Sequence, residues 1–587
     1  MKRIRLKLNF RSFGTRILFV YIFFIICIGF ISKQLYGLQI VGYENYKNDA
    51  LAQQKKLVPF QPERGEILCR DKTGSLHALA INKRFFEIGI NPSKIESGHA
   101  EIAKALSDAL LLPYGDVYAK VTRTGDPYEI LIKHAPEEQI EQSQNLKIKS
   151  LEVKEQRFRY YPNQSLASHV LGFVGFDSAN PVGKYGLEAL YDELLGGRAV
   201  DPAHFTSLIE NGSLKEFQEA YGNSGASLIL TIDPIIQKEA ERLLEQEVAK
   251  WNAQGGNVIV LDPRTGEIRA LANAPSFDPN TYAKEKSLSV FMNSAIALRY
   301  EPGSVFKPFT VAGGLVSGRI TPTTEYYDSG EVKVDDKVIR NAGNSSPKKM
   351  ISISMFLQRS YNVGAVFVES AMGDSFFKDF LLKDLKFQEK TGIDLPGEVL
   401  NSFSNFFPPE GRRINFANAS FGQGIALTPL KLIQEFAVFA NHGILMKPYI
   451  IDEIRYADGD VEITHPQKIA QVFPAKVANE VSLLLEDVVS AEKGSGRLAR
   501  IEGYRVAGKT GTGDIAREDG KGYYANKINH TFVGFAPASE PQLIILTRVE
   551  DPKGVKYAEA TAVPLFQKIM KFSLDYYGIP PDAVDNQ

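Results

Sequence analysis

The longest run of hydrophobic positions lies near the start of the chain. Residues 17–31 read ILFVYIFFIICIGFI, without a single charge. With the aliphatic stems of Arg16 and Lys33 at its ends, this run approaches the roughly 20 residues that a membrane-spanning helix needs. The pattern therefore predicts one transmembrane anchor at residues 17–38.

Charge is distributed unequally on the two sides of this predicted anchor. The first acidic residue is Glu44, whereas the residues before the anchor include Lys2, Arg3, Arg5, Lys7, Arg11 and Arg16. Because short cytoplasmic segments carry an excess of Lys and Arg, we expect a cytoplasmic tail at residues 1–16 and an extracytoplasmic remainder, in a single-pass protein of the cytoplasmic membrane. A cleaved signal peptide is the alternative, but residues 32–36 (SKQLY) offer no cleavage site of the A-x-A kind.

After the anchor, short β-rich runs alternate with turn signals and a few helical stretches. Within RGEILCRDKTGSLHALAIN, the residues Asp71–Gly74 are expected to form a hairpin turn. Residues 99–112 and 136–145 have the spacing of amphipathic helices. A polar stretch with glycines follows at 211–227. We therefore expect a β-rich pedestal domain at residues 45–222.

A new pattern begins near residue 225. The segment LILTIDPIIQKEAERLLEQEVAKW is typical of a strand followed by a helix, and residues 255–273 have the pattern of a hairpin. Strands at both ends of this region, with helices between them, predict an α/β (α+β) domain at 225–580, in which helices cover both faces of an antiparallel sheet. The C-terminal strands are expected at 503–512, 529–538 and 542–550, before a closing helix at 558–576.

The overall composition excludes several classes of protein. Lys plus Arg number 68 and Asp plus Glu number 69, so a formal net charge of -1 lacks the basic excess of a nucleic-acid binder. Only two cysteines occur, which rules out a disulfide framework. The eight histidines are scattered and no HExxH or CxxC spacing occurs. We therefore expect neither a metal site nor another cofactor.

Candidate chemistry first appears where a loop meets a helix, in the sequence EPGSVFKP. Ser304 falls in the expected first turn, where unpaired backbone N–H groups favour developing negative charge. Lys307, three residues later, shares its helix face. A serine hydroxyl becomes a good nucleophile only when a base removes its proton, and a lysine can do so only when it is neutral. The pKa of Lys307 must therefore be lowered by burial or by a second cation.

No single motif identifies a site, because each motif recurs. Order and context nevertheless select one set, namely Ser304–Lys307, then Ser360–Asn362 after a predicted helix, then Lys509–Thr512 at the end of a strand pattern. The other copies of S-x-x-K begin at Ser345, Ser346, Ser375 and Ser490, those of S-x-N at Ser143 and Ser178, and those of K-T-G at Lys72 and Lys390.

The sequences GSVFKP, SYN and KTGT resemble the active-site motifs of the serine penicillin-binding proteins and β-lactamases. Blocks along nearly the whole chain, among them RGEILCRDKTG, KYGLEALYDELLGG and SFGQGIALTPL, resemble the class B penicillin-binding proteins. This resemblance implies a tail and anchor, a pedestal of the dimerisation type and a transpeptidase domain of the penicillin-binding fold. Within the class, SYNVG is similar to division-type, FtsI-like members, whereas elongation-type relatives tend to have Asp at the third position.

The resemblance implies a peptidoglycan D,D-transpeptidase that needs no cofactor and is a target of β-lactams. Its serine would attack the penultimate D-alanine of a D-Ala-D-Ala stem peptide and pass the acyl group to an amine of a neighbouring stem. Backbone N–H groups of Ser304 and Thr512 would form the oxyanion hole. The implied side-chain roles are Ser304 as nucleophile, Lys307 as base, Ser360 and Asn362 as relay and amide ligands, Lys509 as second cation, Thr510 and Thr512 as carboxylate ligands, and Gly511 as a point of close substrate approach.

Five further residues have weaker signals. Arg64 and Glu188 lie in blocks that resemble pedestal signatures, and we expect them to pair, with two unrelated surface charges as the alternative. Gln423 and Thr428 are expected to line the cleft, unless FGQG is simply a tight turn before a helix. Tyr361 is expected to serve in packing.

Other functions share parts of this pattern. A penicillin hydrolase is disfavoured by the anchored pedestal and by the lack of an evident deacylating carboxylate, whereas a carboxypeptidase, a β-lactam sensor and an elongation-type transpeptidase stay open. A scaffold of a membrane assembly is the hypothesis of a different class, and the intact motif set argues against it. No second domain for glycan polymerisation is evident. The resemblance therefore also implies partners, an FtsW-type glycosyltransferase and other division proteins.

Overall fold

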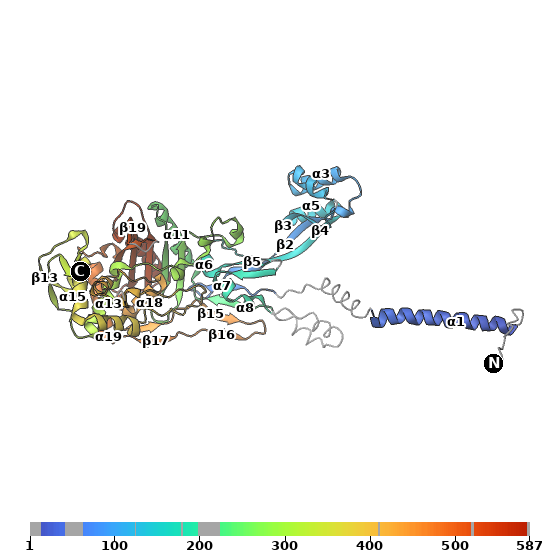
Figure 1. The fold of residues 1–587 in the computed structure, drawn as a ribbon. Coiled ribbons are helices and arrows are strands. Elements are labelled where there is room, and N and C mark those ends of the chain that lie inside the picture. The colour runs from blue at the N-terminus through green and yellow to red at the C-terminus, as the bar shows by residue number, and fades with distance from the viewer. Residues whose placement is uncertain are drawn as a thin grey trace, which may run out of the picture. The chain divides into compact units, whose positions relative to one another are not determined.

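A computed structural model of the protein describes residues 13–41, 63–123, 125–177, 180–197, 224–408, 411–517 and 522–583 (Figure 1). The N-terminal helix and the rest of these residues belong to two separate units. Three predicted segments lie wholly or largely outside the described residues: the cytoplasmic tail up to residue 12, the start of the pedestal at 45–62, and the glycine-containing stretch up to residue 223.

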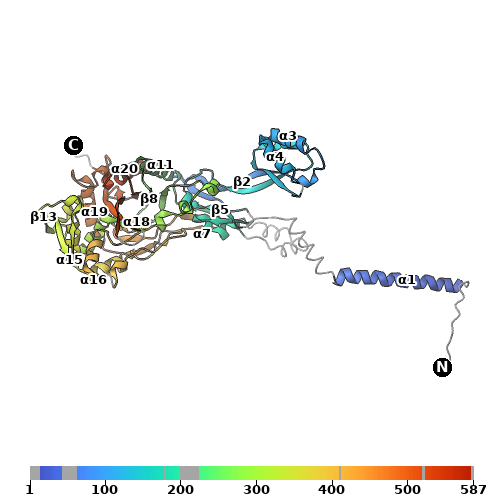
Figure 2. The ribbon, with the colours of Figure 1, turned by 45° about the horizontal axis from the view of Figure 1, so that its top comes forward.

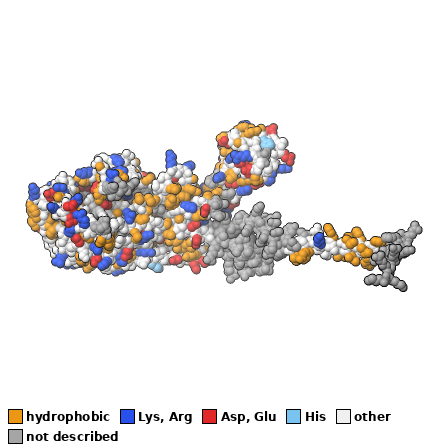
Figure 3. All heavy atoms as spheres, in the orientation of Figure 1, with side chains coloured by type: hydrophobic (Ala, Val, Ile, Leu, Met, Phe, Trp, Pro, Cys, Tyr) orange, Lys and Arg blue, Asp and Glu red, His pale blue; other side chains and the backbone are white. Residues whose placement is uncertain are grey.

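The first unit contributes the helix α1 (Phe13–Tyr36), which continues into a π-helical turn at Gly37–Val41. Its segment Phe19–Tyr36 has a mean hydropathy of 1.8, and none of it is buried within the structure. The described side chains are mostly hydrophobic and exposed (Figure 3). By length and composition, α1 can cross a membrane.

The pedestal is built on a seven-stranded sheet in the order β16-β15-β7-β1-β2-β3, with β4 also pairing with β2. The turn between β1 and β2 is closed by the Gly74 N–H, which donates to the Asp71 carbonyl, while the Asp71 carboxylate accepts from the Thr73 N–H. The predicted hairpin turn is thus confirmed. The strands are β1 (Ile67–Arg70), β2 (Leu76–Ile90), β3 (Glu129–Ala135), β4 (Leu151–Tyr160), β7 (Ser227–Leu230), β15 (Ile451–Arg455) and β16 (Val461–Ile463).

Three helices lie against one end of the β2, β3 and β4 strands (Figures 1 and 2). They are α3 (His99–Leu110), α4 (Tyr114–Val121) and α5 (Glu137–Asn145), and α3 and α5 confirm the two predicted amphipathic helices. Their apolar faces and the strands enclose a separate small core that contains Ile88, Ile90, Leu106, Val117 and Leu131.

The transpeptidase region is built on a five-stranded antiparallel sheet, in the order β18-β19-β20-β8-β9. Alternate residues of β8 belong to different cores, because successive side chains of a strand point to opposite faces. Val258 packs with the helices on one face of the sheet, whereas Ile259 packs in the core that the helices on the other face help to form. The strands are β8 (Gly255–Leu261), β9 (Ile268–Ala274), β18 (Ala507–Ala516), β19 (Tyr523–Ala536) and β20 (Leu543–Glu550).

The helices on both faces agree with the predicted architecture. They are α11 (Pro234–Lys250) and α20 (Ala562–Tyr577) on one face, and α13 (Lys307–Val316), α18 (Pro429–Ala440) and α19 (Ala475–Ser490) on the other. The start of α11 is set by Asp233, whose carboxylate caps the Ile235 N–H at 2.9 Å, followed by a proline at the first helical position.

Smaller elements complete the second unit. Those of the pedestal are α6 (Ser168–Leu171), β5 (Phe173–Asp177), β6 (Asn180–Lys184), α7 (Gly186–Leu190) and α8 (Asp192–Gly196). Those of the transpeptidase region are α12 (Ser294–Ala297), β10 (Glu325–Asp328), β11 (Glu331–Val334), β12 (Lys337–Arg340), β13 (Lys349–Ser352), α14 (Ile353–Arg359), α15 (Asn362–Met372), α16 (Asp374–Asp379), α17 (Arg413–Ala419), β14 (Ile444–Met446) and β17 (Lys468–Gln471).

The pedestal sheet extends across the predicted domain boundary at residue 225. Strand β7 pairs in parallel with β1, and β15 pairs with the other edge of β7. Three strands from the predicted range 225–580 thus complete the pedestal sheet. The strand predicted before α11 is present as β7. It belongs to the pedestal sheet and not to the transpeptidase sheet, because it pairs with β1 and β15, which come from distant parts of the chain.

Candidate active site

The candidate nucleophile lies in a tight turn at the start of a buried helix. Residues Gly303–Phe306 form a 3-10 turn that continues directly into α13 at Lys307. Ser304 is half-buried. Gly303 has φ +59°, a left-handed value that favours glycine. The expected α-helical turn is therefore a 3-10 turn, which still places Ser304 and Lys307 one turn apart.

Glycines allow three segments to meet at this turn. A Cβ on Gly303 would lie 2.4 Å from the carbonyl oxygen of Thr512, and a Cβ on Gly511 would lie 2.5 Å from that of Pro302. On the other side, the Gly303 N–H donates to the Gly422 carbonyl at 3.1 Å. Gly511 was expected to admit a substrate backbone. The structure shows a second role for this residue, since only glycine lets β18 pack against the nucleophile turn.

The fully buried amine of Lys307 contacts the S-Y-N segment. It donates to the carbonyl oxygen of Ser360 at 2.6 Å, to Oδ1 of Asn362 at 2.9 Å and to the hydroxyl of Ser360 at 3.3 Å. The described residues include no hydrogen bond between Lys307 and the Ser304 hydroxyl. Catalytic hydrogen bonds often tighten only in the complex with substrate. The geometry therefore allows Lys307 to act as the general base for Ser304.

Ser360 and Asn362 occupy the junction of two helices. Ser360 ends α14 with φ +59°, a conformation uncommon for a residue with a side chain, and Asn362 begins α15. The Asn362 amide nitrogen donates to the Arg340 carbonyl at 2.9 Å. Because that bond fixes which end of the amide is the donor, the Asn362 oxygen faces Lys307.

Lys509 approaches the same serine hydroxyl from β18. Its fully buried amine donates to Oγ of Ser360 at 3.0 Å and to Oγ1 of Thr510 at 3.2 Å. The Ser360 hydroxyl therefore lies between two lysine amines that come from distant parts of the sequence.

Both lysine amines have lowered pKa values. Burial lowers the pKa of Lys307 well below its usual value, and the neighbouring charge of Lys509 lowers it further. Burial also lowers the pKa of Lys509 to about 7, against an opposing effect of Glu559. Both effects favour the neutral form of Lys307, which a general base requires.

These groups suit acyl transfer through a serine. They supply a hydroxyl on a helix-leading turn, an amine that can be neutral, a second hydroxyl in contact with both amines, and an amide oriented by the backbone. Among the described residues, no group of three or more His, Cys, Asp or Glu side chains could hold a metal ion.

Comparison with known proteins gives the family. Residues 256–571 match the penicillin binding protein transpeptidase domain, and residues 59–201 match the penicillin-binding protein dimerisation domain. The chain belongs to the penicillin-binding protein transpeptidase family. Stage V sporulation protein D of Bacillus subtilis is 32% identical, over 96% of this chain and 86% of that protein. Peptidoglycan D,D-transpeptidase FtsI of Escherichia coli is 28% identical, over 95% and 91%.

Solved structures share the fold of this penicillin-binding protein. Penicillin binding protein 3 of Mycobacterium tuberculosis, complexed with aztreonam, has a TM-score of 0.66 and 23% identity, over 89% of this chain and 98% of that one. Penicillin Binding Protein 2X of Streptococcus thermophilus has a TM-score of 0.72 and 21% identity, over 89% and 81%. The predicted fold class and class B assignment are confirmed. The chain is a serine-type peptidoglycan D,D-transpeptidase that acts on stem peptides and binds β-lactams.

The predicted pair in the pedestal of this penicillin-binding protein is also present. Nε of Arg64 lies 2.7 Å from the carboxylate of Glu188, and Nε of Arg159 lies 2.6 Å from its other oxygen. The Glu188 side chain is fully buried. The pair is therefore an interior cluster and not two surface charges.

Gln423 and Thr428, which were expected to line the cleft, make different contacts. Thr428 is buried and caps α18, where its hydroxyl accepts from the Lys431 N–H at 3.2 Å. It therefore does not line the cleft, because its side chain is used by the helix terminus. Gln423 donates to the Asp514 carboxylate of β18 at 3.2 Å. Tyr361 is partly buried and packs against the main core, as expected.

Two residues beside the site were not predicted from the sequence. The Glu301 carboxylate accepts from the Tyr523 hydroxyl and from the Gly424 N–H, both at 3.0 Å, and burial raises its pKa to about 7. The Ser495 hydroxyl lies 3.1 Å from that of Thr510. Neither belongs to a motif. The available signals were the position of Glu301 just before the nucleophile turn and the two glycines that flank Ser495.

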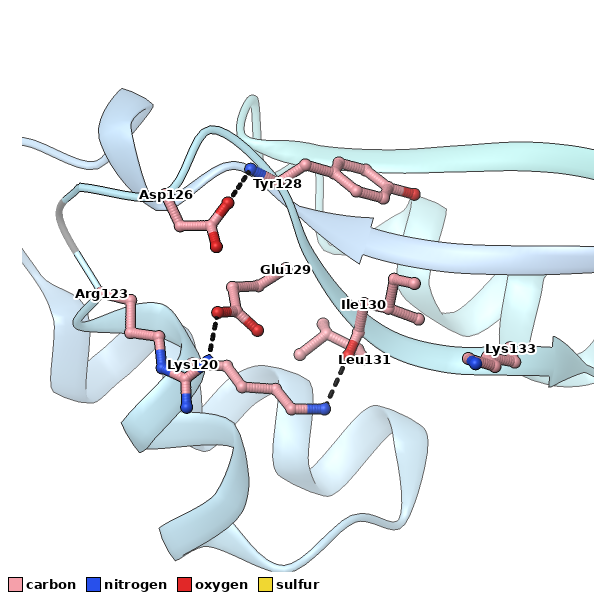
Figure 4. Close-up of a pocket in the computed structure, with 8 residues that line it drawn as sticks. All are labelled: Lys120, Arg123, Asp126, Tyr128, Glu129, Ile130, Leu131 and Lys133. Carbon is pink, nitrogen blue, oxygen red and sulfur yellow. Dashed lines mark hydrogen bonds and ion pairs between the residues drawn. The ribbon is translucent and has the colours of Figure 1, made fainter. Parts of the chain in front are cut away.

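The pedestal also contains an open hollow of about 500 Å³ (Figure 4). The Lys120 amine donates to the Ile130 carbonyl at 2.6 Å, and Arg123 pairs with Glu129 at 2.6 Å. These basic groups already have partners, and the hollow contains none of the serine chemistry described above. Its lining residues are Lys120, Arg123, Asp126, Tyr128, Glu129, Ile130, Leu131 and Lys133.

Proposed function

We propose that Ser304 is the nucleophile and Lys307 the general base of this transpeptidase. The observation that carries the proposal is the Ser360 hydroxyl, which lies 3.3 Å from the Lys307 amine and 3.0 Å from the Lys509 amine. This contact joins the three motif groups into one hydrogen-bonded network beside Ser304. An ordinary pair of surface residues would not place two buried lysine amines around one hydroxyl.

In the acylation step, Oγ of Ser304 attacks the carbonyl carbon of the penultimate D-alanine while Lys307 accepts the hydroxyl proton. The peptide bond to the terminal D-alanine then breaks. The proton passes from Lys307 through the Ser360 hydroxyl to the leaving amine. Free D-alanine departs, and the donor stem remains as an ester of Ser304.

In the transfer step, an amine of a neighbouring stem attacks this ester. Lys307, neutral again, accepts the proton of the attacking amine as the new amide bond forms, and it returns a proton to Ser304 Oγ as the ester bond breaks. The cross-linked product leaves with the enzyme unchanged. No cofactor is needed, because proton transfer and charge stabilisation account for every step.

Substrate binding is assigned to β18. Thr510 and Thr512 hold the terminal carboxylate, with Lys509 as the nearby cation, and Asn362 binds the substrate amide. The N–H groups of Ser304 and Thr512 stabilise the oxyanion. Each such donor is worth roughly 10²–10³-fold in rate. The short approach of Gly303 to the Thr512 carbonyl supports this arrangement, since it brings the two segments that carry these donors together.

The proposal is tested by treating the intact protein with benzylpenicillin and mapping the added mass. One adduct is expected on Ser304, and it should persist for many minutes. Ser304→Ala should abolish it, whereas Ser490→Ala, in another S-x-x-K copy, should not. Labelling elsewhere, or no labelling, would contradict the assignment. Release of the adduct within seconds would instead indicate a penicillin hydrolase.

The domain organisation and orientation are part of the proposal. We infer a cytoplasmic tail at 1–16, an anchor at 17–38, a pedestal at 45–222 and a transpeptidase domain at 225–580, with everything beyond the anchor outside the cytoplasm. The hydrophobic helix α1 and the basic residues before it support this. Protease added to spheroplasts should digest the catalytic domain and spare the tail; protection of the catalytic domain would reverse the orientation.

We further infer a role in septal wall synthesis, with an FtsW-type glycosyltransferase and other division proteins as partners. The SYNVG sequence and the relatives named FtsI support this inference. A fluorescent fusion should localise to midcell. Localisation along the side wall would favour elongation. Normal growth and cross-linking with Ser304→Ala would favour a scaffold.

A further inference from the structure

Ser495 connects the two elements that carry most of the proposed site. It follows α19, and its N–H donates to the Gln358 carbonyl of α14 at 2.9 Å. Its hydroxyl lies 3.1 Å from the hydroxyl of Thr510 in β18. Because α14 leads to Ser360 and β18 carries Lys509, Ser495 is tied to both sides of the hydrogen-bonded network.

The backbone around Ser495 holds this hydroxyl in place. The Gly494 N–H donates to the Ala491 carbonyl at 3.0 Å, and the Gly496 N–H donates to the Val488 carbonyl at 3.2 Å. A Cβ on Gly494 would lie 2.1 Å from the same Val488 oxygen. The chain therefore folds back over the end of α19 in a way that only glycine permits, and this places Ser495 beside β18.

The hydroxyl of Thr510 can give one proton and accept two. Without substrate, it accepts one hydrogen bond from the Lys509 amine at 3.2 Å and donates its proton to the Ser495 hydroxyl at 3.1 Å. A carboxylate only accepts hydrogen bonds, so a bound carboxylate requires the proton of Thr510. The Ser495 hydroxyl can then rotate and donate its own proton to the remaining lone pair of Thr510.

We propose that Ser495 is a positioning residue for recognition of the substrate carboxylate: it donates to Thr510 and thereby holds the Thr510 proton toward the carboxylate. This inference rests on the proposed role of Thr510 as a carboxylate ligand. Hydroxyls that accept and donate in a chain strengthen one another's bonds. Loss of Ser495 therefore weakens recognition of the carboxylate without removing a group that touches the reacting atoms.

The test compares two acylating agents on the full-length protein in detergent. One is benzylpenicillin and the other is its carboxamide, which lacks the negative charge. With Ser495→Ala, the second-order rate constant for benzylpenicillin should fall about fivefold, the size of one lost hydrogen bond, while that for the carboxamide should stay unchanged. Ser495→Thr keeps the hydroxyl and should restore the ratio of the two rates. Ser490→Ala, at the exposed end of α19, should leave it unaltered.

Two results would overturn the inference. If Ser495→Ala slows both agents equally, the residue serves only to pack α14 against β18; if it changes neither rate, it has no part in the reaction. Thermal unfolding of each variant establishes that it is folded. Failure of the underlying function is distinguishable, because the wild-type protein would then carry no adduct on Ser304, or Thr510→Val would leave the ratio unchanged.

Discussion

At the residue scale, the site depends on two lysines that share one serine hydroxyl. Their opposite tasks require different protonation: Lys307 must be neutral to accept a proton, whereas Lys509 serves best as a cation beside a carboxylate. Burial lowers the pKa of both, and the charge of Lys509 further favours the neutral form of Lys307. The opposing effect of Glu559 keeps the pKa of Lys509 from falling further.

This electrostatic balance predicts a pH dependence. Lys509 loses its charge above its pKa of about 7, so the rate of acylation by a carboxylate-bearing penicillin should decline on the alkaline side. Glu559→Gln removes a group that raises this pKa, so the decline should begin at lower pH. The measurement is the acylation rate constant across neutral pH. Glu502→Gln, an exposed acid near the start of β18, is the control, and a shift toward higher pH in Glu559→Gln would contradict the prediction.

At the element scale, the sequence predicts single elements better than it predicts how they pair. The pattern of apolar residues predicted the strands and the closing helix well, because these elements bury regular sets of apolar side chains on the two faces of the transpeptidase sheet. The pairing of β7 could not be predicted. Its four residues, Ser227–Leu230, fit either sheet, and the choice depends on β1 and β15.

The close approach at the nucleophile turn gives a prediction for Gly303→Ala. An added Cβ would combine a left-handed φ with a contact of 2.4 Å to the Thr512 oxygen, so Ser304 must move. We expect acylation by benzylpenicillin to fall at least about tenfold. Gly318→Ala is matched for backbone strain, since φ is +67° but nothing lies within 4 Å of the new Cβ.

That control variant should lose only about 1 kcal/mol of stability from strain and keep its acylation rate. Equal effects of the two substitutions on acylation would show that strain, and not the contact with β18, limits the position of Ser304.

At the scale of the whole molecule, the pedestal is bound into one unit with the transpeptidase region. The parallel pairing of β1 with β7 and the Gly225 N–H, which donates to the Glu63 carbonyl at 2.7 Å, join segments from both predicted domains. Beside this junction lies the buried cluster of Glu188 with Arg64 and Arg159. The cluster therefore stabilises the pedestal where the chain passes into the catalytic region.

Glu188→Gln should destabilise the protein by about 3–5 kcal/mol, because it leaves the buried Arg159 guanidinium without its counter-charge and Arg64 with Asp192 alone. Differential scanning calorimetry measures the loss. The exposed pair of Arg84 and Glu155 is the comparison, and Glu155→Gln should change stability by less than about 1 kcal/mol. Below the unfolding temperature, Glu188→Gln should still be acylated by benzylpenicillin. A loss of stability no greater than that of Glu155→Gln would refute the importance of the cluster.

The sequence alone determined the features that depend on local pattern: the hydrophobic anchor, the alternation of strands and helices, and the ordered motifs that carry Ser304, Ser360 and Lys509. Only the tertiary structure decided features that depend on contacts between distant segments. These are the membership of β7 in the pedestal sheet, the burial of Thr428 as a cap, and the position of Ser495 beside Thr510. Local periodicity reflects which face of an element avoids water, whereas pairing and burial depend on partners whose distance in space the linear sequence does not express.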